Sequence, residues 1–148
     1  MQDGCNLLLV CIYENDIIYI SSSQALLNDF KNDIMKVLKM TDLGFLHYFV
    51  GIEVKQGDER TFITQRKYTE DLLNQYGMKS CKAMATLMNT NDKLQHEDGS
   101  SNGDAKQYRR LIGKLMYVTH TQFDICFFVG MLSRFMNSPT KSHLGAAK

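Results

Sequence analysis

The sequence has no excess of charge of either sign, because 17 basic residues face 16 acidic ones and the formal net charge is +1. Nucleic-acid-binding domains usually carry a basic excess or a basic stripe, so such a role must rest here on local clusters. No apolar run reaches the roughly 18 residues of a membrane span, and no charged-then-apolar leader opens the chain. We therefore expect an intracellular protein, in cytoplasm or nucleus, that is neither secreted nor inserted in a membrane.

Cysteine is also sparse, and the four cysteines show no Cys-x-x-Cys pair with a histidine partner: Cys5, Cys11, Cys81 and Cys126. A structural zinc site is therefore not expected. Cys11 and Cys126 lie in apolar runs, which predicts small buried hydrophobic side chains. Free thiols are typical of a reducing compartment. The four histidines are too scattered for a metal site: His47, His96, His120 and His143.

What the sequence does contain is a pair of apolar, β-branched runs within residues 7–20. Two such runs around a short polar interruption predict a β-hairpin over residues 6–21. Asn15 and Asp16 tolerate turn backbone angles, so the hairpin places Glu14, Asn15 and Asp16 at its tip. Side chains there can reach metal, substrate or water, although a Glu-Asn-Asp triplet alone is most often an ordinary polar turn.

The rest of the first half predicts a helix and further short strands. Serines 21–23 supply a cap for a helix over residues 24–38, whose apolar stripe should face the core: Leu26, Leu27, Phe30, Ile34, Val37 and Leu38. Residues 45–54 predict a strand or a pair of short strands, followed by a turn at 56–60 and a return strand at 61–63. One small antiparallel sheet should form from residues 6–21 and 45–64, with the 24–38 helix packed against it.

The second half predicts helices. Thr64 should cap a helix over residues 65–76 that ends at Gly77. Residues 80–103 are polar and aperiodic, which indicates a loop or linker. Asp104 should cap the next helix, and Thr121 with Asp124 should form a capping box for a fourth helix. That helix ends at residues 138–139, before another that starts at residue 140. The fold class is α+β, divided into residues 1–79, 80–103 and 104–148.

Tyr13-Glu14-Asn15-Asp16 resembles the Tyr-x-Asp-Asp hairpin of reverse transcriptases with one aspartate replaced. Several downstream segments resemble the copia-type retrotransposon polymerase in order and spacing, from about residue 5 to the end: residues 40–44, 47–54, 65–68, 108–115 and 132–136. The resemblance implies that residues 1–79 are a partial polymerase palm and the start of the thumb. Residues 104–148 then correspond to a truncated thumb and connection.

The resemblance also implies a site and its partners. Two magnesium ions roughly 4 Å apart would serve nucleotide addition on an RNA or DNA template-primer. Their ligand positions are Asp16 and Asn15, the latter a degenerate position. A primer-grip segment falls on Leu43, Gly44 and Phe45. Nucleic-acid contacts fall on five cations: Arg66, Lys67, Arg109, Arg110 and Lys114.

Departures from the family pattern predict loss of activity. In the family, residue 15 is the aspartate that bridges both metals, and an asparagine amide offers only one neutral oxygen. Glu14 is a poor substitute, because strand alternation should turn it away from its neighbour. The strand with the third aspartate is expected to be absent, since only six residues precede the hairpin. At three further positions the family has proline, where this sequence has Ala83, Leu87 and Phe123. At residue 122 the family has arginine, where this sequence has Gln122.

We therefore expect an inactive polymerase fragment whose partner is a missing upstream polymerase segment. Its exposed sheet edge should favour self-association. The alternative is a retained, non-catalytic module that binds nucleic acid or protein. These two hypotheses differ in whether the five cations converge on one surface.

Overall fold

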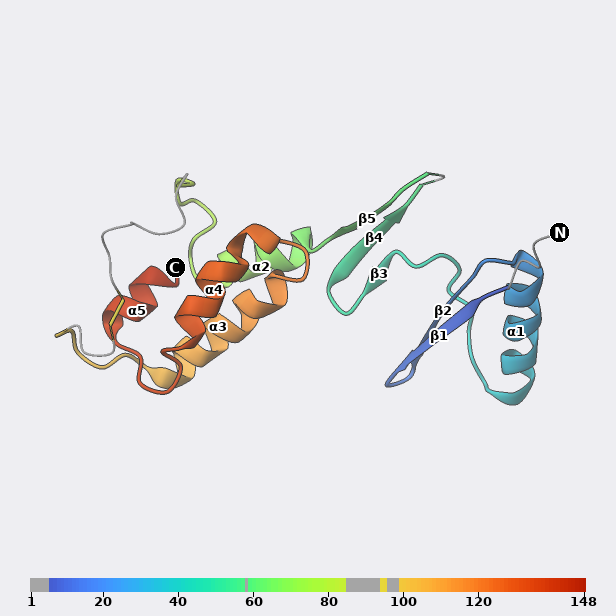
Figure 1. Cartoon of the computed structure of the whole chain (residues 1–148), viewed down its shortest axis with the longest axis horizontal. Coiled ribbons are helices and arrows are strands. Elements are labelled where there is room, and N and C mark those ends of the chain that lie inside the picture. Colours follow the sequence, from blue (N-terminus) through green and yellow to red (C-terminus); the bar gives the residue numbers. More distant parts are fainter. Residues whose placement is uncertain (1–5, 58, 85–93, 96–98) are drawn as a thin grey trace. The chain divides into compact units, whose positions relative to one another are not determined.

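The computed structural model describes residues 6–57, 59–84, 94–95 and 99–148 (Figure 1). Small antiparallel sheets and several helices make the fold α+β, as predicted. The chain divides into two compact units, Met1–Leu46 and His47–Lys148. Among the described residues, no helix is both long and apolar enough to cross a membrane.

The first unit is a hairpin with one helix. Strands β1 (Leu8–Tyr13) and β2 (Asp16–Ser21) pair antiparallel, and α1 (Gln24–Val37) follows. The Ser23 side chain accepts a hydrogen bond from the amide of Leu26, which confirms the predicted start of α1. Helix α1 contacts β2, where the rings of Tyr19 and Phe30 pack edge to face with centroids 5.3 Å apart.

The prediction of a core-facing stripe on α1 is correct for four of its six residues. Its first four members are half-buried, but Val37 is 82% exposed and Leu38 is exposed as well. No described residue of this unit is fully buried. The prediction that Cys11 is buried is also wrong, because two strands and one helix provide too few layers to enclose it.

The second unit opens with a three-stranded antiparallel sheet in the order β3 (Tyr48–Phe49), β4 (Ile52–Gln56), β5 (Thr61–Thr64). The predicted pair of short strands and return strand are thereby confirmed. The single sheet expected from residues 6–21 and 45–64 is wrong, because the strands form two separate sheets. Gly44, with a φ of +75°, interrupts the extended chain shortly before β3 begins.

The described residues of this unit also form four α-helices and one 3₁₀ helix: α2 (Arg66–Gln75), α3 (Ala105–Val118), η1 (Phe123–Ile125), α4 (Cys126–Ser133) and α5 (Lys141–Ala146). Asp104 caps α3 as predicted, accepting from the amides of Lys106 and Gln107 at 2.8 and 3.1 Å. Gly77 ends α2 with a φ of +68°. The Met78 amide then donates to the Leu73 carbonyl at 2.8 Å, which completes the predicted left-handed stop.

Two predicted helix starts differ from the structure. The capping box at residues 121–124 is wrong, because the Thr121 hydroxyl donates to Oε1 of Gln65 at 2.9 Å. Helix α4 instead follows η1, and neither has a side-chain cap. Residue Gln65, rather than Thr64, is the N-cap of α2, although the Thr64 hydroxyl accepts from the Arg66 amide at 3.2 Å. Half of the predicted 80–103 linker, residues 85–93 and 96–98, lies outside the described residues, and the three-part domain division stays a prediction.

The core of the second unit lies between α3, α4 and α5. Its buried apolar members are Tyr108, Ile112, Leu132 and Phe135. The fully buried His143 stacks on Phe135, with ring centroids 4.0 Å apart. Nδ1 of His143 accepts from the Thr140 amide at 3.0 Å, so Nε2 carries the proton and donates to the Gln95 carbonyl at 3.0 Å. This ring therefore fixes the start of α5 and a residue 48 positions earlier.

Tyr108→Phe should lower the free energy of unfolding by about 1 kcal/mol at neutral pH, because the buried hydroxyl donates to the Leu132 carbonyl at 2.8 Å. Burial raises the pKa of Tyr108 to about 12 in the folded protein, above roughly 10 for an unfolded tyrosine. Its stabilising effect is therefore complete below pH 10 and disappears as the pH rises through 12.

Denaturant unfolding at several alkaline pH values measures this effect. Wild-type stability should fall more steeply than that of Tyr108→Phe between about pH 10 and 12. Tyr48→Phe, at an exposed tyrosine of β3, is the matched control and should follow the wild type. Identical slopes for the wild type and Tyr108→Phe would contradict the prediction.

Candidate functional site

The hairpin tip places its polar side chains in solvent. Tyr13 pairs with Asp16 in the antiparallel register, so Glu14 and Asn15 form the turn. The turn lies one residue earlier than predicted, and Asp16 is the first residue of β2. Glu14 has a φ of +50°, a left-handed conformation that few residues other than glycine adopt. Strand alternation consequently does not govern the direction of the Glu14 side chain.

The groups at this tip that could bind a metal ion are the Asp16 carboxylate, the Asn15 amide and the Glu14 carboxylate. A pair of magnesium ions needs carboxylates that bridge both cations and cancel their charge. Since an amide supplies one neutral oxygen and Glu14 belongs to the turn, these residues do not fit a two-magnesium site. Across the described residues, no group of three or more His, Cys, Asp and Glu side chains is placed to hold a metal ion.

The predicted primer-grip residues lie in an exposed segment that Asp42 anchors. The Asp42 carboxylate forms an ion pair with Lys31 of α1 and accepts from the Gly44 amide at 3.0 Å. The hydrogen bond from Lys31, with that from Gly44, holds the pKa of Asp42 below its usual value. The apolar side chains on either side of Gly44 are exposed, with Leu43 at 87% and Phe45 at 76%. Their contact with a primer stays a prediction.

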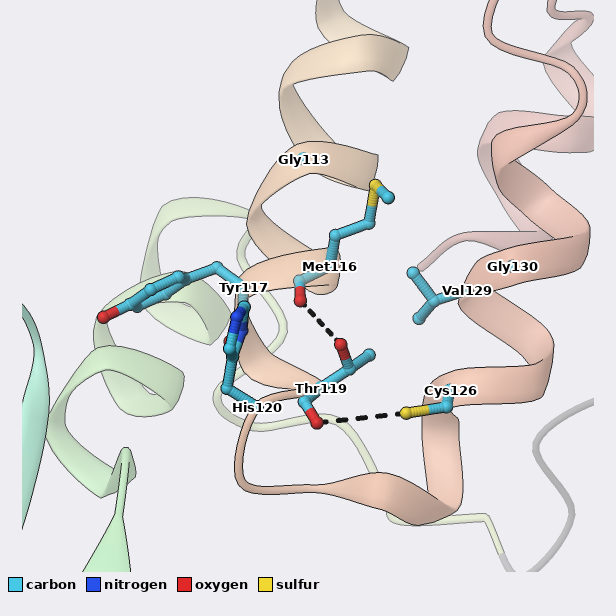
Figure 2. Close-up of a pocket in the computed structure, with 8 residues that line it drawn as sticks. All are labelled: Gly113, Met116, Tyr117, Thr119, His120, Cys126, Val129 and Gly130. Carbon is cyan, nitrogen blue, oxygen red and sulfur yellow. Dashed lines mark hydrogen bonds between the residues drawn. The ribbon is translucent and has the colours of Figure 1, made fainter.

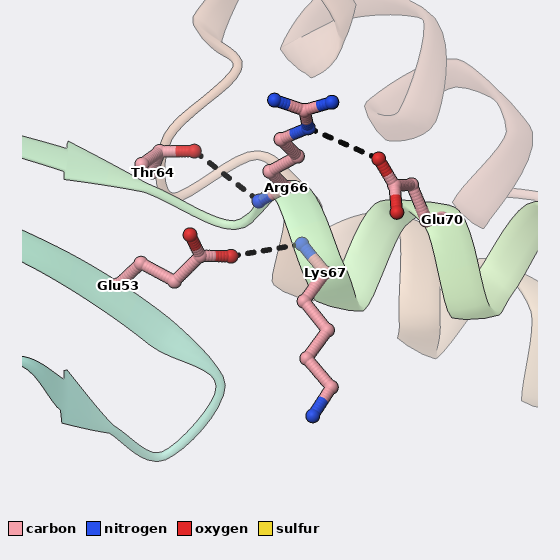
Figure 3. Close-up of polar contacts among 5 residues, drawn as sticks. All are labelled: Glu53, Thr64, Arg66, Lys67 and Glu70. Atoms are coloured by element: carbon pink, nitrogen blue, oxygen red, sulfur yellow. Dashed lines mark hydrogen bonds and ion pairs between the residues drawn. The ribbon is translucent and has the colours of Figure 1, made fainter.

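Of the two cations at the start of α2, Arg66 forms an ion pair, whereas the ammonium of Lys67 points away from Glu53 (Figure 3). Nε of Arg66 lies 3.0 Å from Oε1 of Glu70. The backbone amide of Lys67 donates to Oε1 of Glu53 on β4 at 2.9 Å. A carboxylate thus already occupies the positive end of the α2 dipole, which lowers the attraction of this surface for a phosphate.

The carboxylate of Asp104 likewise occupies the positive end of the α3 dipole, but the cations further along α3 have no acidic neighbour on their own helix. No acidic residue occurs between positions 105 and 123. In the described part of the chain, Arg109, Arg110 and Lys114 make no ion pair. Lys106 was not among the predicted residues, although its spacing places it in one helical row with residues 110 and 114. That i, i+4 spacing was the signal that could have found it.

The five predicted cations do not gather in one cluster. Lys114 hydrogen-bonds the side chain of Gln75, the last residue of α2, whereas Arg66 is its first residue. The ends of a ten-residue helix are about 14 Å apart. The cations therefore divide into a pair on α2, of which Arg66 is ion-paired with Glu70, and a row on α3 that makes no ion pair among the described residues.

A hollow of about 480 Å³ lies between α3 and α4 (Figure 2), and sequence reasoning did not find it. The side chains of Met116 and Val129 face each other across it. Gly113 and Gly130 also line the hollow, and they have no side chains to fill it. The polar groups of its wall are used internally: Cys126, exposed and not buried as predicted, donates to the Thr119 carbonyl at 3.9 Å. With no polar groups converging on it, the hollow is a packing gap rather than a reaction site.

Gly130→Ala should raise the free energy of unfolding by about 0.5–1 kcal/mol, because alanine favours helix more than glycine does. An added Cβ at Gly130 meets nothing within 4 Å. Gly51→Ala is the matched control and should destabilise. Gly51 has a φ of +83°, and its added Cβ would lie 3.4 Å from the Tyr117 ring. Denaturant unfolding of both variants measures the difference; a loss of stability in Gly130→Ala would contradict it.

Comparison with known proteins resolves the family. The model of the reverse transcriptase (RNA-dependent DNA polymerase) family matches residues 1–90. The chain belongs to the reverse transcriptase family of copia-type retrotransposons. It is 32% and 33% identical, over all its 148 residues, to the retrovirus-related Pol polyproteins from transposons RE2 and RE1 of Arabidopsis thaliana. It spans 10% of the length of each.

A third relative is an uncharacterized mitochondrial protein of Arabidopsis thaliana. It is 35% identical over 130 residues, which are 87% of this chain and 53% of that protein. No solved structure matches the chain. The copia-type family predicted from the hairpin and the downstream segments is thereby confirmed.

Proposed function

We propose that this reverse transcriptase segment does not catalyse nucleotide addition, and that Asn15 is the change that disables it. The family resemblance gives residue 15 the carboxylate that bridges two magnesium ions. An amide at that position removes one negative charge and one ligand oxygen. The tip then retains Asp16 as the only carboxylate at a family metal position. The observation that carries the proposal is therefore Asn15 in the exposed two-residue turn of the β1–β2 hairpin.

Asn15→Asp in the 148-residue chain should raise Mn²⁺ affinity at the tip by about tenfold, because it adds a full charge beside Asp16. The two adjacent carboxylates repel each other, so stability without metal should fall slightly and recover when metal binds. Line broadening of the hairpin amides by Mn²⁺ measures the affinity, with Asn15→Ala as the uncharged control. Equal affinities in Asn15→Asp and Asn15→Ala would contradict the expectation.

Primer extension on an RNA template tests the activity itself. Two scaffolds are compared, the 148-residue chain and its fusion to an upstream fingers-and-palm segment of a related element. The fusion with Asn15→Asp should extend the primer at a rate about a hundredfold above that of the fusion with Asn15, since a metal ligand is worth several kcal/mol. Neither form of the 148-residue chain should extend it. Extension by the unmodified chain overturns the proposal. No extension by a folded Asn15→Asp fusion would show that other positions, such as Gln122 and Phe123, also disable the enzyme.

The row of cations on α3 favours a second candidate, a non-catalytic segment that binds a nucleic-acid backbone. Four cations on one helix, Lys106, Arg109, Arg110 and Lys114, face no acidic side chain on that helix. Neutralising phosphates with such cations releases counterions, so binding must weaken as salt rises. The pair on α2 should contribute less, because Arg66 is already ion-paired with Glu70 and the Glu53 carboxylate lies at the start of that helix.

Replacing Arg109 and Arg110 by glutamine should weaken binding to an RNA–DNA duplex uniformly across sequences. The slope of log K against log salt should fall in magnitude by about 2, one unit for each phosphate that is no longer neutralised. The double variant Arg66→Gln, Lys67→Gln removes the same charge from α2 and is the matched control. Fluorescence anisotropy over a salt series measures both slopes; equal changes in the two variants would contradict a site on α3.

A further inference from the structure

Among the described residues, β1 pairs with β2 alone, so its other edge has no strand partner there. Residues of an antiparallel pair alternate between positions that exchange hydrogen bonds and positions that do not. The Ser22 amide donates to the Leu7 carbonyl at 3.0 Å, so residue 7 and every second residue after it bond toward β2. The backbone groups of the intervening residues point to the free edge: Leu8, Val10 and Ile12.

The sequence of this edge carries neither the charges nor the proline that protect many natural sheet edges. Protection usually comes from charges, proline, or a covering element. Residues 4–13 contain no charged residue and no proline. Most side chains of β1 are exposed, Ile12 to 71%. A two-stranded hairpin is marginal in water, and this unit has no fully buried residue among those described. A third strand on β1 would supply the missing partners.

We propose that β1 pairs with β1 of a second copy of this chain, antiparallel and with two-fold symmetry centred on Val10. In this register Val10 lies opposite Val10 and Leu8 lies opposite Ile12, so every facing pair is apolar. The strand is therefore complementary to itself. The proposal depends on the hairpin edge alone and stands apart from the activity of the chain.

Charge selects this arrangement. Antiparallel pairing separates the two hairpin tips by about 20 Å or more, the length of a six-residue strand. Parallel pairing would instead bring Glu14 and Asp16 of both copies together. The edge of β2 begins with the charged Asp16, and a β1–β2 contact between copies would leave an open edge at each end and polymerise. The β1–β1 contact closes as a dimer.

Val10→Pro tests the edge without breaking the hairpin, because the Val10 amide points away from β2 and proline is tolerated at such positions. In sedimentation equilibrium over a dilution series, the full-length wild type should be a dimer that dissociates on dilution. Val10→Pro should be monomeric throughout and keep the wild-type far-ultraviolet circular dichroism. Cys11→Pro is the matched control, because it removes an amide that bonds β2 and should lose the strand signal.

Three results would overturn the proposal: a wild type that is monomeric at every concentration, a Val10→Pro variant that keeps the wild-type mass, or species larger than a dimer. The last result would mean that β2 takes part in the contact. Each can be read from the sedimentation data alone.

A disulfide tests the register even if Val10→Pro fails to fold. Leu9 should lie opposite Cys11 of the second copy, in a pair whose Cα atoms are about 4.5 Å apart, within reach of a disulfide. With Cys5, Cys81 and Cys126 replaced by serine, Leu9→Cys should give a covalent dimer on mild oxidation. Without it, the two Cys11 side chains are about 7–8 Å apart and should not bond.

Ile12→Cys in the same background is the matched control, because its side chain lies on the opposite face of the sheet. It should give no covalent dimer. Absence of the dimer in Leu9→Cys, or equal dimer in Ile12→Cys, would overturn the register.

Discussion

The second unit depends on one buried amide, the side chain of Gln65, which is 2% exposed. Its Nε2 donates to the Tyr117 carbonyl at 3.1 Å, and its Oε1 accepts from the Thr121 hydroxyl. A buried amide without partners is costly, so α2 must begin where α3 ends. Tyr117 extends this junction, because its ring packs against Tyr68 and its hydroxyl donates to the Val50 carbonyl. The β3–β4 turn, α2 and α3 thereby meet at one point.

That junction explains how the second unit tolerates the strained backbone of Val50. Val50 is β-branched and has a φ of +47°, a conformation such residues rarely adopt. It persists because the surrounding contacts determine the turn, above all the hydrogen bond from Tyr117. The first unit has one comparable residue, Glu14, in a turn that no buried contact supports. Stability is consequently uneven along the chain, and the hairpin should open at a lower free energy than α3 does.

The sequence predicted those features whose signals are local. Ser23, Asp104 and Gly77 end or begin helices through bonds to neighbours within five residues, so their motifs suffice. The bond from Thr121 to Gln65 spans 56 positions, and no local pattern contains it. The prediction that Cys11 is buried failed for a related reason. An apolar run indicates that a strand can be buried, but whether Cys11 is covered depends on layers that the run does not encode. The sequence predicted the hairpin tip because the signals for a hairpin are local, although it placed the turn one residue too late. The metal-binding role of Asp16 and Asn15 stays a prediction.

Because stability is uneven along the chain, a substitution at the hairpin tip can change the chemistry there without changing the fold. Asn15 lies in an exposed turn, and among the described residues no packing depends on its side chain. Exchanging a carboxylate for an amide there changes the charge beside Asp16 and leaves every buried contact in place. It even removes a repulsion between adjacent carboxylates. A chain can therefore lose a ligand at this tip while its strands, caps and Gln65 junction persist. A substitution at this turn can therefore alter the charge of the tip without altering the contacts that hold the rest of the described fold.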